Sequence, residues 1–147
     1  EDIPVFPPEH FARVSPADSM KRKQFVKGIE QLAEEGAIQV YKQPDIGTET
    51  YIIGVVGVLQ FEVLEYRLKA EYGVDIRQNT LNYRQARWVA PDADGKHSDP
   101  KKLSLTSTTL LVLDKDENPV LLFESDWAID WALDRNKGLK LASIHEN

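Results

Sequence analysis

Gly54 and Gly57 form a Gly-x-x-Gly step between a short apolar segment and a long helical pattern. A glycine-rich turn before a helix can bind phosphate through its backbone N–H groups, but a nucleotide-binding loop of this kind also needs a Lys followed by Ser or Thr. Neither residue type follows Gly57, where the sequence continues VLQFEV. The step therefore does not indicate a phosphate site, and we predict no cofactor-binding residue.

The side chains that most often bind metals are sparse. His10, His97 and His145 are isolated, and the chain contains no Cys. The acidic run DKDENP at 114–119 lacks the Gly at position six and the Glu at position twelve of a calcium loop, so it predicts a hairpin turn. A catalytic Ser would need His and Asp neighbours that a sequence alone does not place. We predict no metal ligand and no catalytic residue.

Basic side chains gather at the start of the first expected helix, and acidic side chains at its end. This order opposes the helix macrodipole at both ends. One interpretation is a patch that attracts nucleic-acid phosphate, and the other is a set of ordinary exposed charges screened by salt. The residues are Lys21, Arg22, Lys23 and Lys27 at the start, and Glu34 and Glu35 at the end.

Arg84 and Arg87 are a second candidate contact. They are three residues apart in an expected strand at 81–89, beside Tyr83 and Trp88, and should lie on opposite faces. An arginine next to an aromatic ring could stack on a base or contact a partner, although such pairs more often cover a sheet edge.

Composition limits the class of protein. The chain has 147 residues, 41% hydrophobic and 29% charged, with no apolar run long enough to cross a bilayer. Its net charge of −6 disfavours wholesale binding of duplex nucleic acid, so any basic contact must be local and we expect no DNA partner. We expect a cytoplasmic, globular protein with no membrane role.

The periodicity of apolar residues along the chain predicts an α+β fold. The first part gives strand, helix, strand, strand, helix, strand, which is the split βαβ order of a ferredoxin-like unit with both helices on one face of an antiparallel sheet. Asp18 or Ser19 should cap the first helix, and Gly36 and Gly73 should end the two helices. The expected ranges are 10–15, 20–35, 37–41, 50–53, a central helix ending at 72, and 74–78.

The central helix carries two apolar stripes on opposite sides. At 100° per residue, one stripe should pack on the sheet and the other should be covered by the second half of the chain. The sequence does not show which stripe packs on the sheet and which is covered by the second half of the chain. The stripes are Leu59, Val63, Tyr66 and Ala70, and Phe61, Leu64, Leu68 and Tyr72.

The second half predicts a smaller α+β unit that repeats the order of the first. After a polar loop, a short helix at 98–105, a hairpin at 109–123, a helix capped by Asp126 and a strand at 139–144 are expected. Trp127 and Trp131, one turn apart, should enter a second core, and would mark an interface if exposed.

Two phrases in this order are specific. They are KQFVKGIEQLAEEGAIQVYK at 23–42, and IIGVVGVLQFEVLEYRLKAEYGVDI at 52–76 with ARW at 86–88. Together with the lead-in IPVFPPEHFARV, they resemble the C-terminal domain of the bacterial peptide chain release factor 3 family over about residues 3–90, and only in topology beyond. A weaker likeness is to the ferredoxin-like third domain of elongation factor G, which has GMGELHLEI where this chain has GVVGVLQFEV.

The resemblance implies a function. The full-length protein would be a GTPase that promotes departure of the stop-codon-reading release factors, with GTP or GDP bound in a domain outside this chain. This chain would be non-catalytic and cofactor-free, docking on a small-subunit protein and ribosomal RNA and relaying conformational change. The ribosome contacts would include Lys21, Arg22, Lys23, Lys27, Arg84 and Arg87.

The expected organisation has three parts. Residues 1–9 are a linker from an upstream β-barrel domain, 10–90 a ferredoxin-like unit, and 91–147 a subdomain packed on it. The proline-rich start without Met favours a fragment whose upstream partners are the GTPase and β-barrel domains. Two alternatives remain open: the equivalent domain of an elongation or ribosomal protection GTPase, and a stand-alone ferredoxin-like enzyme or binding module.

Overall fold

The computed structural model describes residues 7–43, 50–96 and 98–143. Most of the expected lead-in, most of the loop at 42–49, the end of the last strand, His97 and His145 lie outside these residues.

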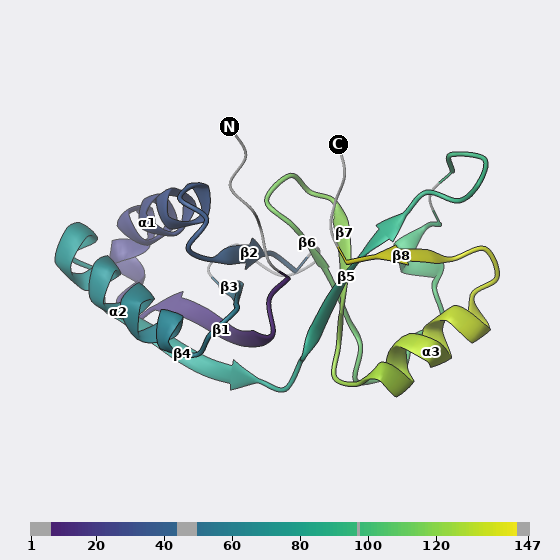
Figure 1. Cartoon of the computed structure of the whole chain (residues 1–147). Helices are drawn as coiled ribbons and strands as arrows, with labels where there is room; N and C mark the ends of the chain where they lie inside the picture. Colours follow the sequence, from purple (N-terminus) through teal and green to yellow (C-terminus); the bar gives the residue numbers. More distant parts are fainter. Residues whose placement is uncertain (1–6, 44–49, 97, 144–147) are drawn as a thin grey trace.

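The elements occur in the expected order (Figure 1). The first seven are β1 (His10–Pro16), the 3₁₀ helix η1 (Ser19–Lys21), α1 (Arg22–Glu34), β2 (Gln39–Tyr41), β3 (Tyr51–Val55), α2 (Leu59–Tyr72) and β4 (Ile76–Leu81). The rest are β5 (Gln85–Ala90), the 3₁₀ helix η2 (Pro100–Lys102), β6 (Leu110–Leu113), β7 (Pro119–Phe123), α3 (Asp126–Arg135) and β8 (Lys140–Ala142).

The strands form two four-stranded antiparallel sheets with the same internal order. The first sheet runs β2-β3-β1-β4 and the second β6-β7-β5-β8, so each strand of the first has a counterpart at the same place in the second. Both sheets follow the ferredoxin-like pattern, and η2 stands where the first unit has α1. The predicted α+β class and the repeat of the first unit by the second are confirmed.

The helix termini differ in detail from those expected. Asp18 accepts a hydrogen bond from the Met20 amide at 2.9 Å, and it opens η1 rather than α1 itself. Ser125, not Asp126, caps α3, since its hydroxyl accepts from the Ala128 amide. The expected short helix at 98–105 is reduced to the single turn of η2.

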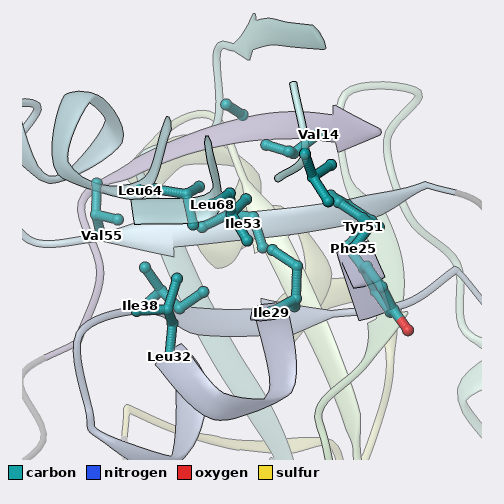
Figure 2. Packing of buried hydrophobic residues seen from close by; sticks show 12 residues of the cluster. Val14, Phe25, Ile29, Leu32, Ile38, Tyr51, Ile53, Val55, Leu64 and Leu68 are labelled. Carbon is teal, nitrogen blue, oxygen red and sulfur yellow. The ribbon is translucent and has the colours of Figure 1, made fainter. Parts of the chain in front are cut away.

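The molecule has four layers: α1 and α2, the first sheet, the second sheet, and α3 (Figure 1). Both faces of the central strand β3 are therefore covered. This explains why β3 is buried at every position, because its alternate side chains enter different cores. Figure 2 shows the core between the first sheet and its helices, where Val14, Tyr51, Ile53 and Val55 meet Phe25, Ile29, Leu32, Leu64 and Leu68.

The two units join through the faces of their sheets. Phe11, Tyr41 and Ile52 of the first sheet pack against the second, and an isolated β-bridge joins Lys42 to Leu113 by hydrogen bonds of 2.8 and 2.7 Å. Residues from the second sheet in this core are Ala86, Trp88, Val112, Val120 and Leu122.

The expectation that the second half of the chain covers one apolar stripe of the central helix is wrong. Leu64 and Leu68 of α2 are buried on the first sheet, as one stripe predicted, but the other stripe is exposed: Leu59 by 69%, Val63 by 51% and Tyr66 by 72%. The second half covers the far face of the first sheet instead. Phe11 and its neighbours make that sheet face apolar too, and the periodicity of the helix carries no information about them.

The boundary expected at residue 90 also moves. β5 pairs with β7 and β8 and makes no ladder with the first sheet, so the change of sheet falls between Leu81 and Gln85. The expected strand at 81–89 is in fact the end of one strand and most of another.

Candidate functional site

The basic residues at the start of the first helix do form one group. Lys21 ends η1, and Arg22, Lys23 and Lys27 lie in the first turns of α1, with Lys23 and Lys27 neighbours at i and i+4. The three lysines are exposed, and none of the ion pairs found among the described residues involves them. They form a local positive patch on an otherwise acidic chain.

Arg22 differs from the lysines because it is half-buried near Tyr51. Burial raises the pKa of Tyr51, the charge of Glu30 adds to this, and the charge of Arg22 partly opposes it. Arg22 therefore takes part in the packing of α1 on the sheet as well as in the basic patch.

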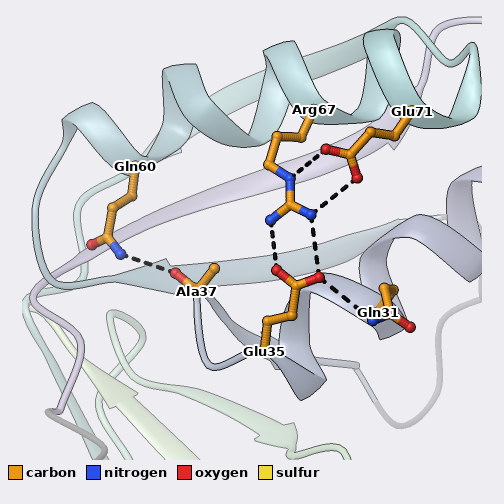
Figure 3. A network of polar contacts seen from close by, with 6 residues as sticks. All are labelled: Gln31, Glu35, Ala37, Gln60, Arg67 and Glu71. Atoms are coloured by element: carbon orange, nitrogen blue, oxygen red, sulfur yellow. Dashed lines mark hydrogen bonds and ion pairs between the residues drawn. The ribbon is translucent and has the colours of Figure 1, made fainter.

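At the acidic end of the same helix, an arginine pairs with Glu35. Arg67 of α2 donates to both carboxylate oxygens of Glu35, at 2.7 and 3.2 Å, and to both of Glu71, at 2.7 and 3.0 Å (Figure 3). Hydrogen bonds from Arg67 hold the pKa of Glu35 and of Glu71 below the usual range. The i, i+4 spacing of Arg67 and Glu71 was visible in the sequence, whereas the link to Glu35 depends on how the helices pack.

The free backbone amides at the Gly-x-x-Gly step form hydrogen bonds within the protein. Gln60 accepts hydrogen bonds from the amides of Val56 and Gly57 at 3.0 and 2.9 Å, and donates to the Ala37 carbonyl at 3.0 Å (Figure 3 shows the last of these). These amides are the kind of donor that a phosphate would need. Gly54 serves packing, since a Cβ there would lie 2.9 Å from Pro8 and 3.0 Å from Phe11.

Arg84 and Arg87 are not brought together with the basic patch. In the pairing of β1 with β4, Pro16 faces Ile76 and Phe11 faces Leu81, so the start of α1 and residue 84 lie beyond opposite ends of these strands. Five residues of strand separate the two ends, about 17 Å. The six predicted contact residues thus form two separate groups.

The aromatic residues beside the two arginines pack within the protein. Arg84 precedes β5, and its amide donates to the Phe123 carbonyl at 2.8 Å. The Tyr83 ring packs edge-on against Phe11, and Trp88 is buried in the core between the sheets. Both aromatic rings are therefore used for packing.

The run at 114–119 is a hairpin turn built on Asp114. Its carboxylate accepts hydrogen bonds from the Trp88 indole at 2.9 Å, from the amides of Asp116 and Asn118, and from the Asn118 side chain. Burial raises the pKa of Asp114, but these hydrogen bonds outweigh it and lower the pKa overall. No sequence pattern predicts the hydrogen bond between Asp114 and Trp88, because the two residues are 26 positions apart. Within the described ranges, no group of side chains is arranged to hold a metal ion.

The expectation for the two tryptophans of α3 is wrong. Ala128 and Ala132 face the second sheet, whereas Trp127 is 65% exposed and the Trp131 ring is stacked under Arg135, whose guanidinium lies 4.9 Å from the ring centre. The small alanines let α3 approach the sheet closely, which leaves the large rings at the helix flank. Because its ring is exposed, Trp127 is a candidate surface contact.

A groove of about 400 Å³ lies where α1 approaches the turn between β6 and β7. Its lining mixes apolar side chains with two lysines, Lys42 and Lys115, and three carboxylates, Glu30, Glu34 and Asp116. Because charges of both signs line it, the groove favours no particular charged ligand. None of the helices in the described ranges has the length and hydrophobicity that a membrane span requires.

Comparison with known proteins decides the family. The family model described as "Class II release factor RF3, C-terminal domain" matches residues 1–133. Peptide chain release factor 3 of Listeria welshimeri is 46% identical over 145 residues, which are 98% of this chain and 26% of that protein. The chain belongs to this family. Proteins of the same name from Macrococcus caseolyticus and Lactobacillus delbrueckii are 44% and 45% identical, over 98% and 95% of this chain and 26% and 25% of their own lengths.

The release factor 3 likeness extends further than the motifs suggested. The sequence motifs support the resemblance only to about residue 90. The family model reaches residue 133, and the relatives cover nearly the whole chain. The second unit is therefore part of the family's domain and not merely similar in topology. The chain spans about a quarter of the length of the curated relatives it matches.

Proposed function

We propose that this chain is the ribosome-docking domain of a GTPase that promotes departure of the stop-codon-reading release factors at the end of translation. The observation that carries the proposal is the match to release factor 3 proteins over nearly the whole chain. In this proposal GTP or GDP binds in another part of the polypeptide, and the chain described here is non-catalytic. It works in the cytoplasm, together with the GTPase and β-barrel domains upstream.

The surface supports a docking role. Lys21, Lys23 and Lys27 project from one end of α1 with no ion-pair partner among the described residues, and clustered cations are what a phosphate backbone attracts. The net charge of −6 confines such contact to this patch. We propose that the patch, with Arg22, contacts ribosomal RNA, and that Arg84 and Arg87 make a separate contact.

The test is a double charge reversal in the full-length release factor. We expect Lys21→Glu with Lys23→Glu to weaken co-sedimentation with purified ribosomes, and to lower the slope of log K against log salt by roughly two, about one for each lost phosphate contact. Lys115→Glu with Lys140→Glu is the matched control, because both lysines are exposed and lie in the second unit. Unchanged sedimentation of the α1 variant at low salt would contradict the proposed RNA contact.

Nucleotide binding separates this proposal from that of a stand-alone enzyme. The backbone amides of Val56 and Gly57 lie just before α2, where a phosphate-binding loop would bind its ligand. Both amides donate instead to the side chain of Gln60. The 147-residue chain should therefore show no measurable affinity for fluorescent GDP, while the full-length factor should bind it. Affinity in the short chain would overturn the non-catalytic assignment.

A further inference from the structure

The groove between α1 and the β6–β7 turn is shared by the two units of the chain. One wall belongs to α1 and the floor to β2 and β3, whereas the other wall is the turn of the second unit. Its volume of about 400 Å³ falls in the size range of small-molecule sites. None of the residues proposed above as ribosome contacts lines it.

The α1 wall of the groove is negative. Glu30 and Glu34 lie at i and i+4 on this helix, and both are exposed. Like charges at this spacing destabilise a helix, so the stability of α1 does not account for the pair. Their neighbour Glu35 is neutralised by Arg67, whereas Glu30 and Glu34 take part in none of the ion pairs found among the described residues.

The opposite wall carries both lysines of the groove. Lys42 follows Val40 by two positions and therefore projects from the same face of the first sheet, the face that packs under the helices. Lys115 lies in the turn that the bridge between Lys42 and Leu113 holds beside β2. Asp116 is next to Lys115, so this wall has two cations and one anion.

The two walls do not meet. None of the ion pairs found among the described residues joins a glutamate of α1 to Lys42 or Lys115. Between the walls the lining is apolar, formed by Ile29, Ala33, Val40 and Tyr51. The groove thus has a negative side, a mainly positive side and an apolar floor between them.

This arrangement selects the chemistry of a ligand. A simple cation is attracted by one wall and repelled by the other, and a simple anion has the reverse problem. A zwitterion gains from both walls when its ammonium faces Glu30 and Glu34 and its carboxylate faces Lys42 and Lys115. An apolar side chain on the same molecule then covers the floor.

We propose that the groove binds a free α-amino acid with an apolar side chain. The ligand contacts α1 of the first unit and the β6–β7 turn of the second, and so links the two units. The inference does not depend on ribosome docking: a factor that binds ribosomes without binding an amino acid refutes only this inference, and the converse result refutes only the docking proposal.

Saturation-transfer difference NMR on the full-length release factor, without ribosomes, tests the ligand class. The probe is L-leucine, and three analogues each lack one of its features: 4-methylpentanoate lacks the ammonium, 3-methylbutylamine the carboxylate and glycine the side chain. We expect L-leucine to bind about fivefold more tightly than each analogue, the effect of losing one exposed ionic or small apolar contact. No saturation transfer to L-leucine at millimolar concentration, or equal affinity for L-leucine and any one analogue, would overturn the inference.

Two sets of variants locate the site through opposite effects on the analogues. Glu30→Gln with Glu34→Gln should weaken L-leucine binding about fivefold and leave 4-methylpentanoate unaffected, because that analogue has no ammonium. Lys42→Gln should weaken L-leucine and leave 3-methylbutylamine unaffected, because that analogue has no carboxylate. A merely misfolded variant would lose all ligands alike, so the pattern separates contact from structure.

The matched control is Asp130→Asn with Asp134→Asn. These carboxylates are also exposed and one helical turn apart, but they lie on α3 and do not line the groove. The control should bind L-leucine as the wild type does. Equal loss in the control and in the α1 variant, or normal L-leucine binding by the α1 variant, would show that the amino acid does not bind in this groove.

Discussion

Tyr41 is a buried tyrosine whose hydroxyl has no hydrogen-bond partner among the described residues. It is 1% exposed in the core between the sheets, and its ring lies 6.2 Å from that of Phe11. Leaving a buried polar group unpaired costs about 1–3 kcal/mol. Tyr41→Phe removes that hydroxyl and keeps the ring. We therefore expect the free energy of unfolding of the variant to exceed that of the wild type by about 1 kcal/mol.

Thermal and urea unfolding followed by circular dichroism measure this change. For a chain of this size, 1 kcal/mol corresponds to a shift in Tm of roughly 2–4 °C. Tyr66→Phe is the control, because the same hydroxyl is removed from a side chain that is 72% exposed and little change is expected. If Tyr41→Phe lowers stability by 1 kcal/mol or more, the hydroxyl has a partner and the reasoning is refuted.

The pH dependence gives an independent check. Burial, and then the charge of Asp114, raise the pKa of Tyr41 well above its ordinary value. The folded state therefore keeps the phenol neutral at pH values where the unfolded chain ionises. The associated stability is complete below the unfolded pKa of about 10 and is lost as pH rises above it. Between pH 8 and 10.5, Tyr41→Phe should lose less stability than the wild type.

Two further substitutions test the packing of the first unit. Gly28→Ala should destabilise the protein by about 1 kcal/mol, because a Cβ at this position would lie 2.5 Å from the buried Leu68 and overpacking of about 1–3 kcal/mol outweighs the helix preference for Ala. Leu64→Asp should prevent folding, because it places a charge without a partner in the core at a cost of several kcal/mol. Urea unfolding measures the first, and circular dichroism with gel filtration the second.

Each of these changes has a matched control elsewhere in α2 or the turn before it. Gly57→Ala should be tolerated, since a Cβ there would contact nothing within 4 Å. Val63→Asp makes the same chemical change as Leu64→Asp one residue earlier, on the exposed stripe, and should remain folded. A folded Leu64→Asp protein, or an unfolded Val63→Asp protein, would show that the assignment of the two faces of α2 is reversed.

Local patterns in the sequence predicted the elements and their order well. Alternation in HFARVS and VDIRQ, the turn formers of DKDENP, and the glycines after α1 and α2 depend on near neighbours only, and Gly36 and Gly73 do adopt positive φ of 80° and 68°. Such features are determined by backbone preferences within a few residues. The order of strands in each sheet then followed from the ferredoxin-like pattern.

Packing between distant segments was harder to predict. The sequence predicts that the second half of the chain covers one of the two apolar stripes of α2. The second unit packs instead on a face of the first sheet, where Phe11 and Ile52 alternate with residues of the other core. For α3, large size suggested that Trp127 would be buried, whereas close approach to the sheet required the small Ala128 and Ala132. Periodicity finds the apolar faces and does not rank their partners.

The candidate site shows the same division. The cluster at Lys21, Lys23 and Lys27 is local in sequence and was therefore found, whereas its separation from Arg84 depends on strand pairing. Glu35, which follows α1, is joined to α2 by hydrogen bonds from Arg67. Charge patterns that cross elements become visible only once the helices are packed.

The sheet-to-sheet core has a mechanical consequence for a docking domain. Tyr41 and Phe11 of one unit interlock with Trp88 and Leu122 of the other, and the Lys42–Leu113 bridge joins the sheet edges. Separating the units would expose this apolar core and break the bridge, at a cost that a hinge between loosely packed domains does not have. If the chain docks on the ribosome as proposed, displacement of its docking surface would therefore move both units, and α3 on the far side, as one body. Conformational relay by this domain would then consist of a change in its orientation and not in its internal fold.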